Sequence, residues 1–599
     1  MRVYFISLIF LSTFLYPSEG ADLTQENCAA CHDDKSLNLI SLDSMSIYSE
    51  EDLINILQQG KMKAQAEHLS TEEIQTIARH ISGNNIPTKE EANICNNDLS
   101  PADLFVGSHW PSFGFDASNS RNQTNTTISS SNIKKLELRW SFGIKNVQVR
   151  SQPVVIGKMV LLSGANTLYA VDKEKGCVYW SFKSKTQIRN SAAFDKLTED
   201  AIYIIDNDFI VYKLNAVDGT IIWKTKIPKE HESNTPSASP LQVDRYLLIP
   251  VSTYETVMAM DPRYECCKSS GAMVAIDTAT GNILWNHRVE QKPKSIGKGL
   301  ISRSKKYAPS GSAVWNSPSV DIEERRVFFG TGQSLQSPAS NFSDAIITLD
   351  LETGKRIWST QTLAGDAYNV GCEVPVVRRM VCPKENGPDF DFGASVIQSL
   401  DLNGEKILLA GQKSGEVFRL NPENGEIVWK SRIGNGGLLG GVHFGMATDQ
   451  SKLYVPISDR WVNRDYDELA RPGLYAVDLE SGAILWSVMS DDICKDRKPL
   501  YGEGHCFPGF SAPISIANDL LFAGSLDGRF SVYSTKDGTK LWEFDTLRTF
   551  QTVNKQPAVG GSIDAAGPVI SDNWIFINSG YAQHAQMAGN VILAFSINN

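Results

Sequence analysis

The chain has 599 residues, 42% of them apolar and 21% charged, which is enough apolar sequence for a large folded core and excludes a mainly disordered protein. Its formal net charge of −11 argues against nucleic acids and anionic membrane surfaces as partners, because those partners select basic patches. A small or uncharged substrate fits this composition better.

The N-terminus has the features of an export signal. An apolar run from Val3 to Leu15 follows a basic start and precedes the small residues Ser18 and Gly20. The run is shorter than the roughly 20 residues of a membrane span, so it predicts a signal peptide over residues 1–20, with an uncleaved anchor as the alternative. No later stretch is apolar enough to cross a membrane, and we expect a periplasmic protein without stable membrane insertion.

A short motif close to the predicted mature N-terminus indicates covalent haem. Cys28, Cys31 and His32 form Cys-x-x-Cys-His, in which two thiols add to the vinyl groups and the imidazole ligates the iron. A zinc or redox Cys-x-x-Cys site is the alternative, but no second cysteine pair accompanies it. Met62 is the predicted second axial ligand. Besides Met45, it is the only methionine between the motif and the last helix of this module.

The haem motif opens a small helical module over residues 21–84. Apolar spacing predicts helices at Glu50–Gln58 and Thr71–Ile81, and Ser70 with Glu73 three residues later has the spacing of a capping box. Residues 85–105 are polar with two prolines and are typical of a linker. The module resembles small monohaem cytochromes c, so we expect an all-α cytochrome c domain.

The rest of the chain, residues 106–599, contains a repeat. An apolar strand ends in Asp, Asn or Ser, a Gly follows four residues later and a Trp four after that, a pattern typical of a β-hairpin. Its seven copies end at Trp180, Trp223, Trp285, Trp358, Trp429, Trp486 and Trp542. Regular hairpins with strands between them predict an all-β propeller of four-stranded blades.

Two further strands raise the predicted blade count from seven to eight. Val591–Phe595 lies at the end of the chain, and Leu136–Trp140 lies before the first repeat. If they pair, the last blade combines both ends of the domain and the ring closes without a free sheet edge. A seven-bladed ring with loose ends is the alternative.

The ten cysteines suit an oxidising compartment. Short spacing suggests Cys372–Cys382 and Cys494–Cys506 as disulfides, with Cys95 and Cys177 left over, although spacing alone does not determine connectivity. Cys266 and Cys267 are adjacent. A disulfide between neighbours strains the chain and is seldom kept for packing alone, whereas two reduced cysteines side by side by chance are the alternative.

Seven segments outside the hairpin pattern carry a family resemblance. They are Tyr264–Cys267, Ala313–Trp315, Phe329–Gly332, Gly365–Asn369, Gly387–Ala394, Ala410–Gly415 and Gly560–Pro568. Through them the chain resembles alcohol dehydrogenases that depend on pyrroloquinoline quinone (PQQ), and among these the polyvinyl alcohol dehydrogenases, over nearly the whole mature chain. The resemblance implies an eight-bladed, tryptophan-docked quinoprotein propeller preceded by a cytochrome c domain.

The resemblance also implies where the quinone and its metal bind. The planar quinone would lie between a Cys266–Cys267 disulfide and Trp315, unless Trp315 only docks a blade. Calcium would bind Glu255, Gln333 and Asp366 through oxygen atoms. Many family members have Asn at position 333, so the Gln puts this ligand in doubt.

Further roles follow from the same resemblance. Asp366 matches the catalytic base, which takes the hydroxyl proton while hydride moves from carbon to the quinone. Lys413 matches a lysine that hydrogen-bonds the quinone oxygens, and Arg189 is expected to pair with a cofactor carboxylate. Ser237 is a weaker cofactor contact. Phe444, where we expect Trp in relatives, is hypothesised to alter substrate preference.

The predicted function is therefore oxidation of secondary alcohols, with polyvinyl alcohol-like polymers as candidate substrates, by hydride transfer to PQQ and electron transfer to haem c. A soluble or membrane-bound acceptor would then take the electrons. Two alternatives remain: a PQQ dehydrogenase for small alcohols, and a non-catalytic propeller scaffold with an electron-transfer cytochrome.

Overall fold

The computed structural model describes residues 19–29, 32, 45, 50–58, 62–82, 93–144, 149–195, 198, 200–299, 303–460, 470–501 and 504–597. Residues 1–18 of the predicted signal peptide (residues 1–20) and the motif residue Cys31 lie outside the described residues. The chain divides into two compact units, and the boundary falls between Glu90 and Glu91.

The first unit is helical. Its described elements are α1 (Glu19–Thr24), the π-helical turn η1 (Gln25–Ala29), α4 (Glu50–Gln58), α5 (Lys63–Ala66) and α6 (Thr71–Ile81). Both predicted helices are confirmed. The capping box is also confirmed, since Ser70 Oγ accepts the Glu73 N–H at 3.2 Å and Glu73 Oε2 accepts the Ser70 N–H at 2.7 Å.

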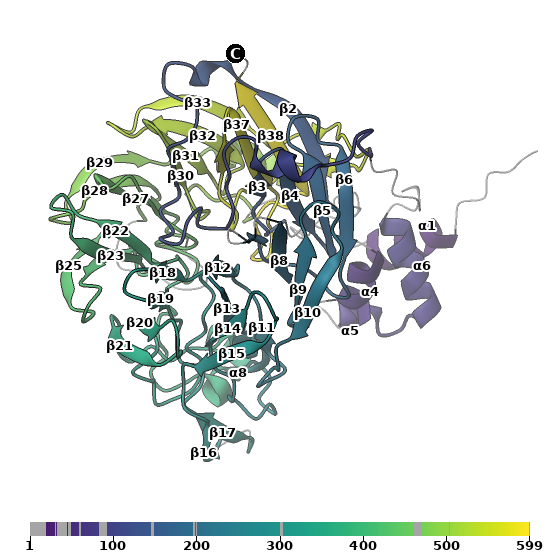
Figure 1. Cartoon of the computed structure of the whole chain (residues 1–599). Helices are drawn as coiled ribbons and strands as arrows, with labels where there is room; N and C mark the ends of the chain where they lie inside the picture. Colours follow the sequence, from purple (N-terminus) through teal and green to yellow (C-terminus); the bar gives the residue numbers. More distant parts are fainter. Residues whose placement is uncertain are drawn as a thin grey trace, which may run out of the picture. The chain divides into compact units, whose positions relative to one another are not determined.

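The second unit is a ring of eight antiparallel sheets around a common centre (Figure 1). Each sheet is one blade, with strands A to D from the centre outwards. Blade 1 has β3 (Val154–Ile156), β4 (Met159–Gly164), β5 (Thr167–Asp172) and β6 (Val178–Lys183); blade 2 has β7 (Ala193–Phe194), β8 (Ala201–Ile205), β9 (Ile210–Asn215) and β10 (Ile221–Lys226). Blade 3 has β12 (Leu241–Val243), β13 (Tyr246–Thr253), β14 (Ala272–Asp277) and β15 (Ile283–Arg288), with β11 (Asn234–Thr235) also paired to β13.

The other blades repeat this plan. Blade 4 has β18 (Ser319–Asp321), β19 (Arg326–Gly330), β20 (Ala345–Asp350) and β21 (Arg356–Gln361); blade 5 has β22 (Ile397–Leu400), β23 (Lys406–Gly411), β24 (Glu416–Leu420) and β25 (Ile427–Arg432). Blade 6 has β26 (Ala447–Thr448), β27 (Lys452–Ile457), β28 (Gly473–Asp478) and β29 (Ile484–Met489); blade 7 has β30 (Ser515–Ala517), β31 (Leu520–Gly524), β32 (Arg529–Ser534) and β33 (Lys540–Asp545), with β1 (Asn122–Gln123) parallel to β30.

Blade 8 closes the ring in the way the sequence predicts. It contains β36 (Val569–Ser571), β37 (Trp574–Ser579) and β38 (Val591–Ile597), and its outer strand is β2 (Leu136–Gly143) from the start of the unit. The two ends of the domain pair in antiparallel register from Leu136 with Ile597 to Gly143 with Val591. This confirms eight blades and rules out the seven-bladed alternative.

The repeat residues join neighbouring blades. The indole N–H of Trp358 donates to Pro422 O at 3.0 Å in the next C–D turn. Contacts of this kind are also made by five other repeat tryptophans, and by Trp140 on β2: the five are Trp180, Trp223, Trp285, Trp429 and Trp486. The glycine of the same turn packs against the indole ring. Gly425 has φ +73°, and a Cβ there would lie 2.4 Å from Trp358. The repeat therefore needs a glycine both for its backbone and for the approach of the indole.

Strand alternation decides where side chains can meet. In an antiparallel blade the B–C connections and the D–A connections to the next blade open at one end of the ring, which we call the site end. The long connections lie there, with α7 (Glu255–Met258), β16 (Lys294–Lys298), β17 (Lys305–Ala308), η5 (Val370–Glu373), α8 (Pro375–Val381) and α9 (Cys494–Tyr501). The Asp-to-Gly turns of the repeat lie at the opposite end.

The disulfides hold several connections. The structure contains Cys372–Cys382 and Cys494–Cys506, as spacing suggests, together with Cys95–Cys177 and the vicinal Cys266–Cys267. Residues 93–105, predicted as part of a linker, are instead attached to blade 1, because Cys95 is bonded to Cys177 and Ile94 bridges Val178. Only the earlier part of that segment therefore remains as a predicted linker.

Candidate active site

All predicted propeller site residues lie at the site end. Arg189, Ser237, Trp315 and Asp366 are in D–A connections, and Glu255, Cys266, Cys267, Gln333 and Lys413 are in B–C connections. Residues from five blades that are far apart in sequence are therefore brought to one end of the ring.

A small pocket opens beside Trp315. Arg189, Ser237 and Phe444 line it together with Trp315. The Trp315 ring meets Phe444 edge-on, with ring centroids 5.8 Å apart and an interplanar angle of 79°. The pocket thus has an aromatic wall and a guanidinium group, and it brings together three predicted cofactor contacts and the residue predicted to affect substrate preference.

Asp391 links further predicted residues to this wall. Its Oδ2 accepts the indole N–H of Trp315 at 2.9 Å, and its Oδ1 accepts the backbone N–H of Gln333 at 2.8 Å. Lys413 Nζ lies 3.7 Å from Asp391 and donates to Asp389 Oδ2 at 2.8 Å. Sequence reasoning assigned no role to Asp389 or Asp391, although both lie in a segment that carries the resemblance. The sequence feature that could have drawn attention to them is the alternation of aspartate with phenylalanine over residues 389–392.

Asp366, the predicted base, contacts the backbone of the segment that carries Asp389 and Asp391. It is fully buried, and its two oxygens accept the backbone N–H groups of Asp389 at 3.2 Å and Phe390 at 2.9 Å. Burial raises its pKa to about 6. A Cβ at Gly387 would lie 2.0 Å from Asp366 Oδ1, so the carboxylate is closely covered on that side. The geometry makes Asp366 a support for the backbone that carries Asp389.

The cluster carries a surplus of negative charge. Asp344 is fully buried, and neither of its oxygens has a hydrogen-bond partner among the described residues. Burial, followed by the charges of Asp366 and Asp391, raises the pKa of Asp344 well above its usual value. Burial lowers the pKa of Lys413, but the carboxylates, Asp389 first, raise it further, so Lys413 stays protonated. Four buried carboxyl groups therefore interact electrostatically with one ammonium group.

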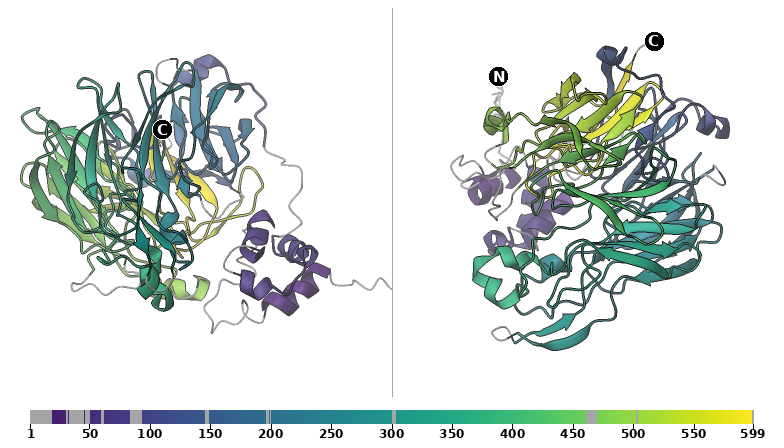
Figure 2. Two further views of the ribbon diagram at one scale, coloured as in Figure 1. Left: turned by 90° about the horizontal axis from the view of Figure 1, so that it is seen from below. Right: turned by 90° about the vertical axis from the view of Figure 1, so that its left-hand side faces the viewer.

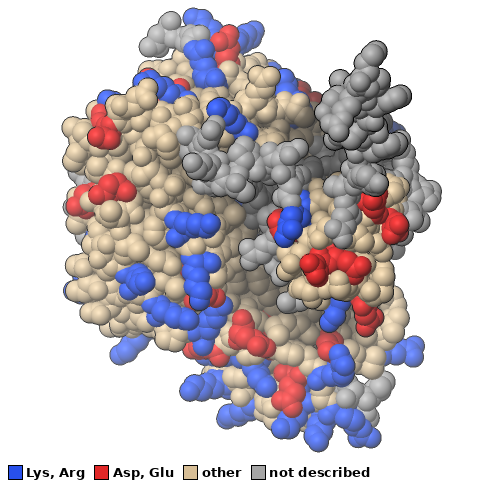
Figure 3. All heavy atoms as spheres, turned by 90° about the vertical axis from the view of Figure 1, so that its right-hand side faces the viewer, with Lys and Arg blue, Asp and Glu red and all other residues tan. Residues whose placement is uncertain are grey.

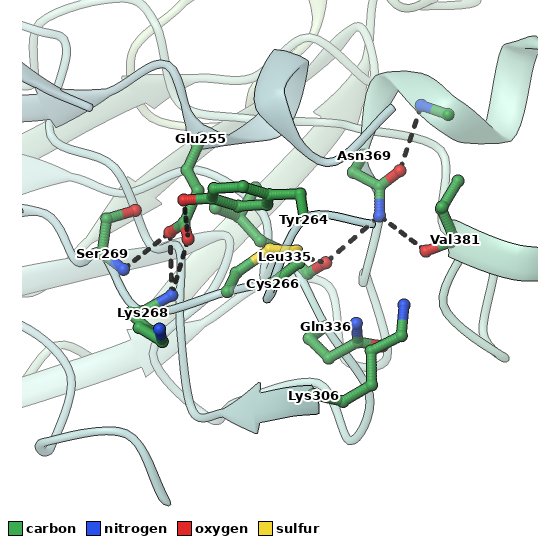
Figure 4. Close-up of a disulfide and its surroundings, with 12 residues drawn as sticks. Glu255, Tyr264, Cys266, Lys268, Ser269, Lys306, Leu335, Gln336, Asn369 and Val381 are labelled. Carbon is green, nitrogen blue, oxygen red and sulfur yellow. Dashed lines mark hydrogen bonds between the residues drawn. A yellow bond between two sulfur atoms is a disulfide. The ribbon is translucent and has the colours of Figure 1, made fainter. Parts of the chain in front are cut away.

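Glu255 and the vicinal disulfide form a separate group (Figure 4). Glu255 is fully buried, and its oxygens accept hydrogen bonds from Tyr264 Oη at 2.9 Å, from the Lys268 N–H at 2.8 and 2.9 Å, and from the Ser269 N–H at 2.6 Å. The disulfide packs with Ala259, Leu335 and Tyr264, whereas Trp315 packs with Phe444, Ala565 and Tyr581. The sandwich of a quinone between the two remains a prediction.

The protein side chains do not form a preassembled metal cage. Within the described ranges, no group of three or more His, Cys, Asp or Glu side chains is placed to hold a metal ion. The hydrogen bonds to Glu255 also occupy the lone pairs that a cation would use. Calcium ligation by Glu255, Gln333 and Asp366 therefore stays a prediction.

Two buried arginines, of which Arg189 lines the pocket, have nitrogen atoms without partners among the residues that the structure describes. Arg189 donates from Nη1 to Tyr254 Oη and from Nη2 to Gln583 Oε1, the latter at 2.6 Å, while its Nε finds no partner in the described chain. Arg460 stacks over Phe507 at 3.6 Å, and its Nε and Nη1 likewise have none among the described residues. Burial lowers the pKa of Arg460 to about 10. Unpartnered buried guanidinium atoms are costly, and they suit an anionic ligand.

In the helical unit, His32 is buried and Cys28 packs against an apolar cluster that contains Leu53 and Ile77. Such surroundings suit an apolar macrocycle. Met45 packs against the same cluster, whereas Met62 is half-buried just before α5. Ligation by Met62 stays a prediction, with Met45 as its rival.

Comparison with known proteins identifies both units. Residues 120–369, 265–436, 413–567 and 470–597 match the family model described as outer membrane protein assembly factor BamB, and residues 17–81 match cytochrome C oxidase, cbb3-type, subunit III. The polyvinylalcohol dehydrogenase of Sphingopyxis sp. (strain 113P3) is 31% identical over 97% of this chain and 93% of its own length. The chain belongs to the polyvinyl alcohol dehydrogenase family. The polyvinylalcohol dehydrogenase of a Pseudomonas species is 30% identical over the same shares.

Other similar proteins are more distant from this member of the polyvinyl alcohol dehydrogenase family. The quinohemoprotein alcohol dehydrogenase of Comamonas testosteroni is 22% identical over 73% of this chain and 69% of its own. Its crystal structure superposes with a TM-score of 0.60 and 17% identity over 82% of this chain and 80% of that chain. A europium-containing methanol dehydrogenase also gives a TM-score of 0.60, at 15% identity over 83% and 98%. These likenesses confirm the predicted fold.

Proposed function

We propose that this chain is a quinohaemoprotein dehydrogenase that oxidises secondary alcohol groups, with PQQ as hydride acceptor and haem c as electron carrier. The observation that best supports this proposal is the buried pair of Asp389 and Lys413 near Trp315, in a member of the polyvinyl alcohol dehydrogenase family. Lys413 Nζ lies 2.8 Å from Asp389 Oδ2. The Cys-x-x-Cys-His motif and the cytochrome match over residues 17–81 support the haem.

The pocket side chains fit the quinone. PQQ is a planar anion with three carboxylates, and the pocket lining offers the flat ring of Trp315 together with Arg150 and the buried Arg189, whose Nε has no partner in the described chain. Guanidinium groups favour carboxylates because the planar fork donates two parallel hydrogen bonds. When bound, PQQ supplies the two-electron acceptor for the hydride. Ser237 lines the same pocket and is a further contact.

A side chain beside Lys413 then accepts the hydroxyl proton of the alcohol. Asp389 is the base we propose, rather than Asp366, because Asp366 is occupied by two backbone N–H groups. Burial outweighs Lys413 and raises the pKa of Asp389 above its usual range, which favours uptake of the hydroxyl proton. Lys413 stays protonated and donates hydrogen bonds to oxygen atoms near it.

The family relationship favours a polymer such as polyvinyl alcohol over small alcohols as the substrate. A scaffold function is the competing class, suggested by the description of the propeller family model. A scaffold has no need of buried polar atoms without partners, and within the described residues both oxygens of Asp344 and the Nε and Nη1 atoms of Arg460 are such atoms. We therefore favour the enzyme.

The four disulfides support an oxidising compartment, and we propose the periplasm. Among the described residues, no helix is long and apolar enough to cross a membrane. The external electron acceptor would approach the haem unit.

The test is reconstitution. The full chain with covalent haem is supplied with PQQ and calcium and offered alcohols from ethanol to polyvinyl alcohol, with dye reduction and haem reduction as readouts. Reduction by secondary alcohols is expected. Absence of quinone absorbance and of dye reduction with every alcohol would leave the scaffold as the better explanation.

A further inference from the structure

A hairpin and a helix at the site end carry an unusual concentration of positive charge. The segment from Gln291 to Ala308 has six basic residues and no acidic one, in a chain of net charge −11. Its strands β16 and β17 pair as a separate two-stranded sheet that projects beyond the blades (Figures 1 and 2). In Figure 3, Lys and Arg side chains gather along the lower margin, where this hairpin lies in Figure 1.

Helix α8 continues this surface. Lys306 Nζ donates to Met380 O at 3.4 Å, which joins the hairpin to the helix. We call the following exposed residues the basic surface: Lys292, Lys294, Lys298, Arg303, Lys305, Arg378, Arg379 and Lys384. In the described parts of the chain none of them has a carboxylate oxygen within 4.0 Å. Nearby carboxylates have other partners, since Glu265 pairs with Lys268 at 3.3 Å and Glu385 accepts the Ala339 N–H at 3.1 Å.

Exposed aliphatic side chains lie among these charges. Val376 on α8 is 84% exposed, and Ile296 on β16 is 48% exposed. Val257 on α7, which contacts η5 next to α8, is 44% exposed. Folded proteins expose single aliphatic residues commonly, but here three neighbouring elements each expose one beside cations.

We propose that the basic surface binds an anionic phospholipid bilayer peripherally, with Val376 and Ile296 entering the headgroup region. Each Lys or Arg near an anionic leaflet adds favourable binding free energy. Aliphatic side chains add more when they enter the lipid, and a charged protein surface would not provide this second contribution. The net charge argues against such a partner, but net charge averages over the chain, and screening limits each charge to a range of about 10 Å at 0.1 M salt. The inference does not depend on the proposed catalytic function.

The test is vesicle flotation with the full holoprotein. Vesicles of phosphatidylglycerol and phosphatidylethanolamine are compared with vesicles of phosphatidylcholine at rising salt. Binding to the anionic vesicles is expected, with loss at high salt and none to phosphatidylcholine. The triple variant Lys294→Glu, Lys298→Glu, Lys305→Glu should weaken the partition coefficient by roughly 100-fold or more.

A matched control carries the same change of charge at the opposite end of the ring. Lys175→Glu, Lys355→Glu and Lys536→Glu alter three exposed lysines in C–D turns and should leave binding within about twofold of wild type, since these lysines lie beyond the screening length from the lipid. Val376→Ser with Ile296→Ser should weaken binding by a similar factor at every salt concentration at which the wild type binds, because the aliphatic contribution is not screened.

Equal losses in both triple variants would overturn the assignment, as would equal binding to neutral vesicles. Capture by polyglutamate beads without binding to anionic vesicles would also overturn it and would indicate an acidic protein as the partner. Thermal unfolding and dye-reduction rates of the variants check that the fold is intact.

Discussion

The most informative substitution is Asp389→Asn, because it removes the proposed proton acceptor with little change in volume. The amide can still accept the hydrogen bond from Lys413 Nζ, which is 2.8 Å from Oδ2, but it cannot take a proton. Removal of a general base typically lowers the rate by about 10²–10⁴-fold. This corresponds to about 3–5 kcal/mol of activation free energy.

The assay is dye reduction by the PQQ-reconstituted enzyme with one secondary alcohol, with quinone absorbance used to confirm equal loading. We expect kcat to fall while KM changes little. Asp366→Asn is the matched control. Its amide oxygen can keep one of the two N–H bonds to Asp389 and Phe390, so we expect a loss below about tenfold. Near-complete loss in Asp366→Asn with retained turnover in Asp389→Asn would refute this reasoning and restore Asp366 as the base.

Three further predictions concern the fold, the haem and pH. Gly425→Ala, with φ +73° and an indole 2.4 Å from the new Cβ, should destabilise the propeller by about 2–5 kcal/mol. Gly404→Ala is the control: its φ is +80° but the space around the new Cβ is open, so it should lower the stability by about 1–2 kcal/mol. Equal melting temperatures of the two variants would contradict this. Met62→Ala should abolish the methionine-to-iron charge-transfer band of the oxidised haem, and Met45→Ala should not; the reverse result would assign the ligand to Met45. Because the pKa of Asp366 is raised from 3.8 to about 6, the folded state holds its proton more tightly, so the wild type should lose about 2 kcal/mol of stability relative to Asp366→Asn as the pH rises from 4 to 6. Parallel unfolding curves across that range would disprove the shift.

At the site end, the sequence predicted which segments form the site but not which aspartate acts as the base. Trp315, Lys413 and Phe444 lie in segments with a recognisable pattern, and the structure places all three around the centre of the ring. The choice between Asp366 and Asp389 depends on which carboxylate faces Lys413 and which faces backbone N–H groups. That choice is a matter of loop conformation, because both residues lie in one D–A connection.

Local patterns in the sequence were sufficient for the eight blades, the closing strand from Leu136 and the haem motif, since hairpins and covalent attachment depend on residues close in the chain. The tryptophan docking was implied by the family resemblance. The tertiary structure alone decided the contacts between distant loops. It showed Glu255 with its oxygens already hydrogen-bonded, Asp344 without a partner among the described residues, and the basic hairpin in contact with helix α8. Burial, charge and hydrogen bonding at these positions arise from segments that meet only when the ring closes, so neither composition nor spacing determines them.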